Sequence, residues 1–384
     1  MRETPLVHWS EDGQARSARW RCERGAPAPK NVVIADDRMT ADDAYGLACQ
    51  GIALLWRGDF QNARQLLTAM GNRVDQPRGP KNRIEPLKSK SPAEVFNLER
   101  QSRSQRARTL GMLLIPLAAD YSIALRRAPD IREACTEAYG PAKDASLVSL
   151  RELLGVVGAH EWRSKGIDLP VIGGRIHPHY GVFAPIRSEY VDLVAKAPLP
   201  AAAASSSVAF DIGTGTGVLA AVLARRGMQR VVATDKDPRA LACARENLER
   251  LGLAARVDVV EADLFPEGRA ALVVCNPPWV PARPSSPLEH GIYDPESRML
   301  LGFLRGLGAH LAPGGEGWLI LSDLAEHLGL RSSQELLDAF EAASLKVVDR
   351  IDARPKHPRV CDATDALHRA RKAEVTYLWR LAAT

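Results

Sequence analysis

The stretch Val208–Gly227, VAFDIGTGTGVLAAVLARRG, decides the fold, because it joins a strand pattern to a helix pattern through closely spaced glycines. Glycine lets the backbone turn sharply at positive φ and lets a ligand lie against the main chain without a Cβ in the way. The loop reads Asp211-x-Gly213-x-Gly215-x-Gly217, whereas the nicotinamide and flavin fingerprint is G-x-G-x-x-G. The loop therefore favours an α/β nucleotide-type site other than an NAD site, with a ligand-free tight turn as the alternative.

Beyond this loop, short apolar runs alternate with helical patterns to the end of the chain, which predicts a mostly parallel sheet covered on both faces. No helical pattern separates the last two runs, so we expect an antiparallel hairpin at the C-terminal edge of the sheet. The expected strands are Val208–Ile212, Arg230–Thr234, Val257–Ala262, Ala271–Cys275, Gly317–Leu321, Lys346–Ile351 and Glu374–Leu381.

Acidic residues end the second and third of these runs. Asp235 closes VVATD, and a carboxylate there can accept both hydroxyls of a ribose. Asp263 follows VDVVEA and would accept from an adenine amino group, with Leu264 as an apolar neighbour of the ring. For Asp263 alone, a helix N-cap is an equally good interpretation. Together the two acids predict a nucleoside across the carboxyl ends of the strands.

The fourth run ends in Asn276-Pro277-Pro278-Trp279. The side-chain oxygen of Asn276 and the carbonyl of Pro277 would give two acceptors for one planar NH₂ group, directing the nitrogen lone pair out of the plane. Trp279 would supply a flat surface, and the prolines would hold these groups in register. The alternative is structural: Pro-Pro ends a strand and Trp279 fills a hydrophobic gap.

These motifs together resemble the class I S-adenosylmethionine-dependent methyltransferases with an Asn-Pro-Pro-aromatic motif, above all the HemK-like protein-glutamine methyltransferases. The resemblance covers roughly residues 181–381 and rests on DIGTGTG, ATDKDPRALACARENLER, VVEADLF, CNPPW, HGIYDPESRMLLGFL and LAPGGEGWLILSD. HemK-like sequences more often have Tyr where Trp279 stands, and an acid-rich run where this chain has PIRSEY.

The resemblance implies a Rossmann-like class I methyltransferase fold, S-adenosyl-L-methionine as the cofactor and a role for each matching residue. The methionine part of the cofactor would be lined by Asp211, Gly213, Gly215 and Gly217, the ribose by Asp235, and the adenine by Asp263 and Leu264. Asn276, Pro277 and Trp279 would hold the target nitrogen, with Asn276 also beside the cofactor. No acid–base pair is required, since a sulfonium methyl is already activated.

The expected activity is methyl transfer to a planar nitrogen, and a protein side-chain amide like that of glutamine is the favoured substrate. Transfer to an exocyclic amine of adenine or guanine in RNA or DNA is an alternative, as is methylation of a small molecule. A hydride-transferring NAD enzyme and a non-catalytic binding module rank lower. The oligomeric state is not predicted.

The chain divides into a mainly helical N-terminal domain at 1–165, a hairpin and linker at 166–207, and the cofactor-binding domain at 208–384. In the first part, apolar positions recur at helical spacing over 40–73, 93–125 and 130–165. We expect this domain to bind substrate or a partner, by analogy of position only.

Charge and cysteine usage restrict the remaining possibilities. The formal charge is +5, and the segment 71–110 has ten Lys/Arg against four Asp/Glu, so it is either a solvated surface or a site for nucleic acid or an acidic protein. The six cysteines are scattered, and no apolar run is long enough to span a membrane, which predicts a cytoplasmic protein. His177 and His179 favour packing or hydrogen bonding, and no metal is expected. The long connection 354–373 is basic and is a candidate cover for the substrate, through Arg354, Lys356 and Arg359.

Overall fold

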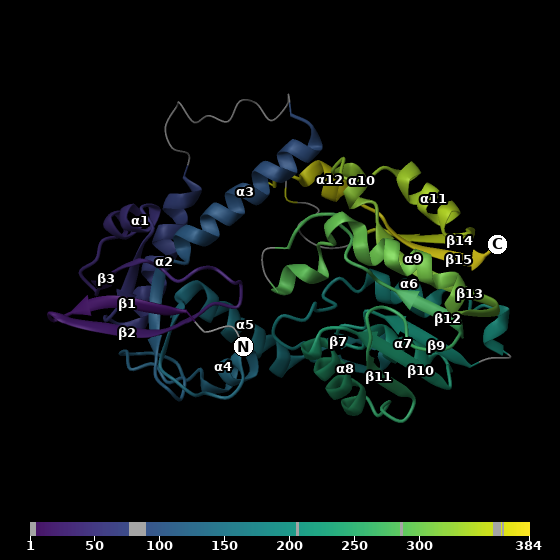
Figure 1. The fold of residues 1–384 in the computed structure, drawn as a ribbon, viewed down its shortest axis with the longest axis horizontal. Coiled ribbons are helices and arrows are strands. Elements are labelled where there is room, and N and C mark those ends of the chain that lie inside the picture. Colours follow the sequence, from purple (N-terminus) through teal and green to yellow (C-terminus); the bar gives the residue numbers. More distant parts are fainter. Residues whose placement is uncertain (1–4, 77–89, 205–206, 285–286, 356–361, 363–364) are drawn as a thin grey trace. The chain divides into compact units, whose positions relative to one another are not determined.

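The computed structural model describes residues 5–76, 90–204, 207–284, 287–355, 362 and 365–384 (Figure 1). Lys356, Arg359 and part of the basic segment, 77–89, lie outside the described residues. The chain forms two compact units. The N-terminal unit comprises Met1–Lys90 and Asn97–Glu161, and the C-terminal unit comprises Ser91–Phe96 and Trp162–Thr384.

The C-terminal unit is built on a seven-stranded sheet with the order β11-β10-β9-β12-β13-β15-β14. Its first five strands in this order are parallel, and β15 pairs antiparallel with both β13 and β14. The strands are β9 (Val208–Ile212), β10 (Arg230–Asp235), β11 (Val257–Glu261), β12 (Ala270–Cys275), β13 (Leu311–Ser322), β14 (Leu345–Ala353) and β15 (Thr376–Ala383). The predicted Rossmann-like fold with its antiparallel edge hairpin is confirmed.

Alternating side chains divide this sheet between two hydrophobic cores, as the two-residue period of a strand requires. Ala209 packs in one core with α6, α7 and α8, whereas the neighbouring Phe210 packs in the other with α9 and α11. Figure 1 shows these helices around the teal-to-yellow strands. The helices of this unit are α6 (Glu189–Lys196), α7 (Val218–Arg225), α8 (Pro238–Arg250), α9 (Arg298–His310), α10 (Leu324–His327), α11 (Ser333–Ala342) and α12 (His368–Ala373).

Local sequence explains where several of these helices begin. Asp237 caps α8 by accepting from the backbone N–H of Arg239, and Pro238 occupies the first turn. Ser332 and Glu335 form a reciprocal capping box at α11. Upstream of the large sheet, the expected hairpin is present as β7 (Ile167–Leu169) and β8 (Gly174–Ile176), which pair antiparallel.

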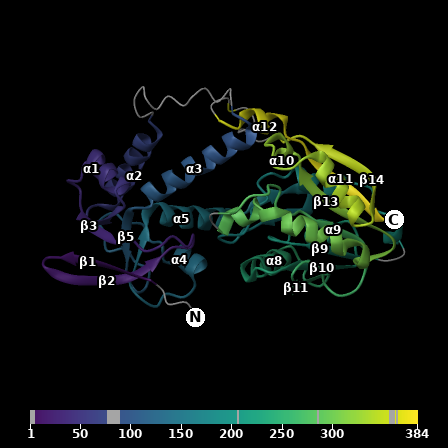
Figure 2. The same cartoon turned by 45° about the horizontal axis from the view of Figure 1, so that its top comes forward.

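The N-terminal unit contains a six-stranded mixed sheet with the order β1-β2-β6-β5-β4-β3. Figure 2 shows β1 and β2 side by side as a ribbon at its edge. The strands are β1 (Leu6–Glu11), β2 (Gln14–Arg21), β3 (Asn31–Ala35), β4 (Ile52–Trp56), β5 (Leu113–Leu117) and β6 (Ser146–Ser149). The helices are α1 (Ala41–Cys49), α2 (Phe60–Asp75), α3 (Pro92–Leu110), α4 (Arg132–Tyr139) and α5 (Leu150–Lys165), of which α3 and α5 continue into the C-terminal unit.

The expectation of a mainly helical N-terminal domain was therefore wrong. The predicted helices over 40–73, 93–125 and 130–165 each contain a strand, namely β4, β5 and β6. These strands are four or five residues long and almost entirely buried, so they have no alternation of polar and apolar residues. A short run that is buried on both faces cannot be distinguished from one turn of a buried helix by periodicity.

No helix among the described residues has the length and apolarity needed to cross a membrane.

Candidate functional site

The candidate site begins at the carboxyl edge of the C-terminal sheet, where three parallel strands end level with one another. Ile212 of β9 is paired in register with Thr234 of β10 on one side and with Cys275 of β12 on the other. The residues that follow, Gly213, Asp235 and Asn276, therefore lie at the same edge of the sheet, with Asp235 as the last residue of β10. This edge is where doubly wound sheets bind ligands, and the sheet register brings the predicted residues together there.

The glycine loop depends on glycine for its conformation and for its packing. Gly213, Gly215 and Gly217 have φ angles of 73°, 54° and 80°, in the left-handed region that other residues rarely adopt. A Cβ at Gly217 would lie 3.2 Å from the backbone Cα of Ala244 in α8. A Cβ at Gly215 would meet nothing within 4 Å, so the loop is open to a ligand at this point.

Met299, at the start of α9, lies against the loop from the other side. Its terminal methyl group occupies the place where a Cβ on Gly213 would be. The backbone N–H groups of Gly213 and Thr214 both donate to the carbonyl of Thr234, which ties the loop to the end of β10. The loop is therefore fixed by the neighbouring strand, while its contact with α9 is a flexible side chain.

Asp211 is buried and has one carboxylate oxygen without a partner. Its Oδ2 accepts from the hydroxyl of Thr214 at 2.6 Å and from the backbone N–H of Ala220 at 3.0 Å. Its Oδ1 is buried and accepts no hydrogen bond from any described residue. Burial is the main cause that raises the pKa of Asp211 to about 6. A buried acceptor of this kind suits a cationic donor, such as an ammonium group.

Asp235 accepts a hydrogen bond from the glycine loop and lies at the edge of the sheet where a ligand would bind. Its Oδ2 accepts from the backbone N–H of Gly215 at 3.1 Å, and its Oδ1 accepts from that of Asp237 at 3.0 Å. Burial raises its pKa above the ordinary value. Each carboxylate oxygen retains a lone pair, so Asp235 can still accept hydrogen bonds from both hydroxyls of a ribose.

Asp263 lies beyond the end of β11 and is exposed. No helix begins after it, so the N-cap interpretation is wrong. Leu264 follows with a φ of 77°, and its carbonyl accepts from the hydroxyl of Thr234 at 2.6 Å. An unusual backbone conformation held by a specific hydrogen bond is typical of binding sites. Phe265 instead stacks on His310 of α9, with ring centroids 4.3 Å apart.

At Asn276-Pro277-Pro278-Trp279 the structure adds a contact that the sequence did not predict. The indole N–H of Trp279 donates to Oδ1 of Asn276 at 2.9 Å. This bond determines which end of the amide is the oxygen, and it leaves the second lone pair of Oδ1 and both N–H groups of the amide. A tyrosine ring has no N–H group, so the Trp at this position makes a contact that the more common Tyr would not make in the same way.

One face of Trp279 is covered by Arg187, whose Cζ lies 5.3 Å from the indole ring. The guanidinium is itself held by Glu189 at 2.7 Å and by the buried Glu374 at 3.1 Å, and Glu374 also accepts from the hydroxyl of Ser322 at 2.7 Å. Trp279 is partly buried and packs against hydrophobic side chains, so it also fills a gap. Its role as a platform for substrate stays a prediction.

Sequence reasoning missed Asp294, which is buried next to this site. Its carboxylate accepts from the backbone N–H groups of Met299 and Leu300 at 3.0–3.1 Å, at the N-terminus of α9. Glu296 and Ser297 between them have φ angles of 58° and 53°, both unusual for residues with a side chain. The motif HGIYDPESRMLLGFL contains all of these residues, so the resemblance marked the segment without assigning a role to Asp294.

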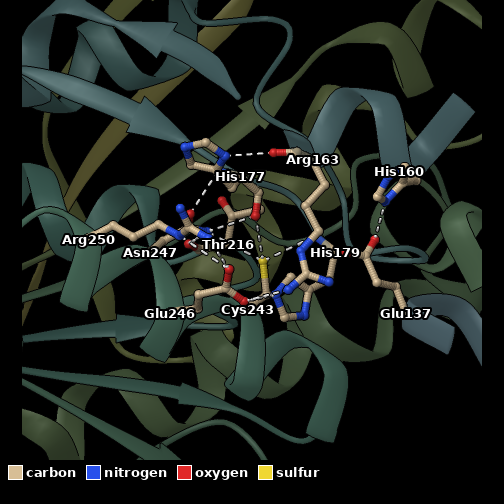
Figure 3. Close-up of polar contacts among 10 residues, drawn as sticks. All are labelled: Glu137, His160, Arg163, His177, His179, Thr216, Cys243, Glu246, Asn247 and Arg250. Atoms are coloured by element: carbon tan, nitrogen blue, oxygen red, sulfur yellow. Dashed lines mark hydrogen bonds and ion pairs between the residues drawn. The ribbon is translucent and has the colours of Figure 1, made fainter. Parts of the chain in front are cut away.

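His177 and His179 take part in a polar network between the segment after β8 and helix α8 (Figure 3). His177 Nδ1 lies 2.6 Å from the carbonyl of Arg163, and His179 Nε2 lies 2.7 Å from Glu246. Asn247 of α8 donates to the carbonyls of His177 and Thr216, at 3.3 and 3.0 Å. Because Thr216 belongs to the glycine loop, this network links the loop to helix α8.

Within the described residues, no group of three or more His, Cys, Asp or Glu side chains is placed to hold a metal ion.

The described arginines of the basic segment 71–110 are largely paired. Arg73 contacts Asp42, Arg103 contacts Glu99, and Arg106 contacts Asp75, each within 3.0 Å. Exposed pairs of this kind are weak and can exchange for phosphates, so nucleic-acid binding by this segment stays a prediction. Of the cations proposed in the connection 354–373, Arg354 is exposed at its start, and the other two lie outside the described residues.

Part of this chain is similar to known methyltransferases. Residues 174–345 match the methyltransferase small domain. A release factor glutamine methyltransferase from Cereibacter sphaeroides is 34% identical over 161 residues, which make up 38% of this chain and 56% of the relative. A ribosomal protein L11 methyltransferase from Pelotomaculum thermopropionicum is 54% identical over 69 residues, which make up 17% of this chain and 22% of the relative.

The chain thus spans little more than half, or less, of the length of these curated relatives. An S-adenosylmethionine-dependent methyltransferase from Thiobacillus denitrificans, solved with S-adenosyl-L-homocysteine, aligns with 53% of this chain and 92% of its own, at 16% identity and a TM-score of 0.34. For the matched segment, the family match and the sequence relatives confirm the resemblance to HemK-like class I methyltransferases, an enzyme class that uses S-adenosylmethionine.

Proposed function

We propose that this protein is an S-adenosylmethionine-dependent N-methyltransferase whose substrate is a side-chain amide of another protein. The observation that carries the proposal is the meeting of three groups at one sheet edge: the unpartnered Oδ1 of Asp211, the carboxylate of Asp235 and the oriented amide of Asn276. These suit, in turn, an ammonium group, a ribose and a planar NH₂ group.

The residues present fit the cofactor. Oδ1 of Asp211 is a buried acceptor with no donor in the part of the chain that the structure describes, and the amino acid end of S-adenosylmethionine has an ammonium group. Asp235 would accept from the ribose hydroxyls, and Asp263 and Leu264 would border the adenine. Gly215 leaves the space for a close approach to the backbone. When bound, the cofactor supplies an activated methyl group.

Asn276 would hold the nitrogen that receives this methyl. Its Oδ1 has one lone pair left beside the bond from Trp279, and the carbonyl of Pro277 would be the second acceptor. Two acceptors in the plane of an amide NH₂ group fix that plane and expose its lone pair. The chain's contribution is therefore position rather than acid–base chemistry, and it needs no general base at Asn276.

The choice of a protein amide rests on the relatives. Two of them bear names of enzymes that act on proteins, a release factor and ribosomal protein L11, and the first is named for glutamine. An amide and an exocyclic base amine share the same planar NH₂ group, so the geometry of Asn276 alone is compatible with both. The N-terminal unit would then bind the substrate protein.

The test is transfer of tritium from methyl-labelled S-adenosylmethionine to a lysate of the source organism, with Asn276→Ala as the matched inactive enzyme. Asn276-dependent label that protease removes supports the proposal, and mass spectrometry of the labelled protein should find methylglutamine. Label removed by nuclease would assign the activity to a base amine instead. Label confined to small molecules would also overturn the protein substrate.

A further inference from the structure

We propose that a pocket in the N-terminal unit binds a small organic anion through the guanidinium of Arg21. The pocket lies wholly within this unit, and the proposal does not depend on the methyltransferase activity.

The cavity has a volume of about 570 Å³ and opens at the end of β2. This is within the usual size of small-molecule sites, about 300–1,000 Å³. Its lining combines aromatic rings, prolines and charged side chains; the principal members are Arg21, Tyr121, Tyr139, Lys143, Pro27 and Pro141. Apolar walls with a few polar groups are the usual composition of a small-molecule site.

Arg21 has the feature that points to an anion. Its guanidinium lies 5.1 Å from the ring centre of Tyr121 and 4.8 Å from that of Tyr139. Its one hydrogen bond is from Nε to the hydroxyl of Ser146, at 3.4 Å, and among the described residues it forms no ion pair. The two terminal nitrogens are therefore left as a fork, which matches the two oxygens of a carboxylate or phosphate.

The walls around Arg21 are fixed by partly buried hydrogen bonds. The hydroxyl of Tyr121 donates to the carbonyl of Gly140 at 3.1 Å, and that of Tyr139 donates to Glu152 at 3.3 Å. Glu152 is buried and also accepts from the backbone N–H of Glu23 at 3.0 Å. Both rings are thus held in position before any ligand binds, which lowers the entropy cost of binding.

Tyr121 adds evidence of strain. It is fully buried and has a φ of 68°, in a region that a residue with a large side chain rarely occupies. Such conformations cost free energy and concentrate at functional sites, where the surrounding structure maintains them. Here the residue with the strained backbone is the one whose ring contacts the guanidinium.

The remaining charges favour the same ligand. Besides Arg21, the charged side chains that line the cavity are Arg19, Glu23, Lys143 and Asp144; Asp144 is paired with Arg19 at 3.0 Å, and the cations outnumber the carboxylates. An anionic group would be bound by the fork of Arg21 with Lys143 near it, and an apolar part of the ligand would pack on the partly exposed Tyr139 and the prolines. Carboxylates and phosphates share this chemistry, so the ligand class is a small organic oxyanion.

The test is calorimetric titration of the full chain with phenyl phosphate and, separately, with benzoate, at constant ionic strength. We expect saturable one-to-one binding of at least one of them. Arg21→Gln should weaken it about tenfold or more, and Arg21→Lys should restore only part of the loss, because lysine has the charge but not the fork. Preference for phenyl phosphate or for benzoate identifies the phosphate or carboxylate source.

The matched control is Arg16→Gln, which removes the same charge from an exposed position of β2 outside the pocket. It should leave binding unchanged. Since Arg21 also stacks on two rings, Lys143→Gln provides a second variant that alters only an exposed side chain, and it should weaken binding about threefold. Absence of saturable binding by the folded wild type, or equal losses in Arg16→Gln and Arg21→Gln, would overturn the proposal.

Discussion

Among the described residues, each unit contains a charged side chain that has hydrogen bonds but no oppositely charged partner, and the two charges have opposite sign. In the C-terminal unit it is the buried Oδ1 of Asp211, and in the N-terminal unit it is the half-buried guanidinium of Arg21. An isolated charge is costly in a folded protein unless a ligand completes its interactions. A charged group that is not fully satisfied by the protein can therefore indicate a candidate site, whether or not a sequence motif marks it.

In the C-terminal unit, the largest effect is expected for the substitution Asn276→Ala. Because Asn276 is proposed to hold only the target nitrogen, turnover should fall about 10³-fold or more. The affinity for S-adenosylhomocysteine, measured by calorimetry, should change less than about threefold. Asn97→Ala, on an exposed position of α3, is the surface control. Substantial remaining turnover would remove Asn276 from the reaction.

A second test compares the loss of stability when a buried carboxylate in each unit loses one arginine partner. Arg187→Met removes the cation that pairs with the buried Glu374, so it should lower the free energy of unfolding by about 3 kcal/mol. Arg127→Met in the N-terminal unit leaves Arg126 on the buried Asp59, and should lower it much less. Urea unfolding of both variants measures the difference, and equal losses would contradict it.

The double variant Arg187→Met, Glu374→Gln sharpens this test. If the loss in the single variant comes from an unpaired buried carboxylate, neutralising Glu374 should recover part of it. No recovery would assign the loss to packing of Arg187 on Trp279.

A third prediction concerns the ionisation of Asp211. Burial raises its pKa to about 6, so the apo protein favours the neutral acid below that pH, whereas an ammonium donor requires the carboxylate. Affinity for S-adenosylhomocysteine should therefore increase as the pH rises from 5 to 7. Asp211→Asn should weaken binding roughly tenfold or more at pH 7.5 and remove this pH dependence. A parallel pH profile in wild type and variant would refute the role of Asp211.

The smallest expected effect comes from Trp279→Tyr, which restores the residue more common in HemK-like sequences. It removes the N–H donor to Oδ1 of Asn276 but retains an aromatic ring. Loss of one orienting hydrogen bond should lower kcat about three- to tenfold with little change in cofactor affinity. An unchanged kcat would mean that the Asn276 amide is oriented without Trp279.

Much of the C-terminal unit could be predicted from sequence, because its strands are separated by helices and its motifs stand at strand ends. The main boundary error is β13, which begins at Leu311 instead of Gly317. The segment LAPGG reads as a turn, but it stays in the sheet through a register shift opposite Ala270–Leu272. The strands of the N-terminal unit were missed because short buried runs have no diagnostic period.

From the sequence, the site could be predicted only for residues that belong to a local motif. Asp211, the three glycines, Asp235 and Asn276 could be proposed as candidates because each stands at a fixed place relative to a strand end. The contacts of Arg187 with Trp279 and Glu374, and the pocket of Arg21 with Tyr121, join positions far apart in the sequence. Such contacts depend on tertiary structure, and a single sequence has no local pattern that reveals them.

The contact of Met299 with Gly213 has a kinetic consequence. A thioether side chain has several rotatable bonds, and side-chain rotations of this kind occur in picoseconds to nanoseconds when the group is not tightly enclosed. Met299 is half-buried, and the glycine loop behind it is fixed by the carbonyl of Thr234. Rotation of this one side chain would uncover Gly213, so we expect cofactor association to be limited by encounter and orientation rather than by a slow movement of the backbone.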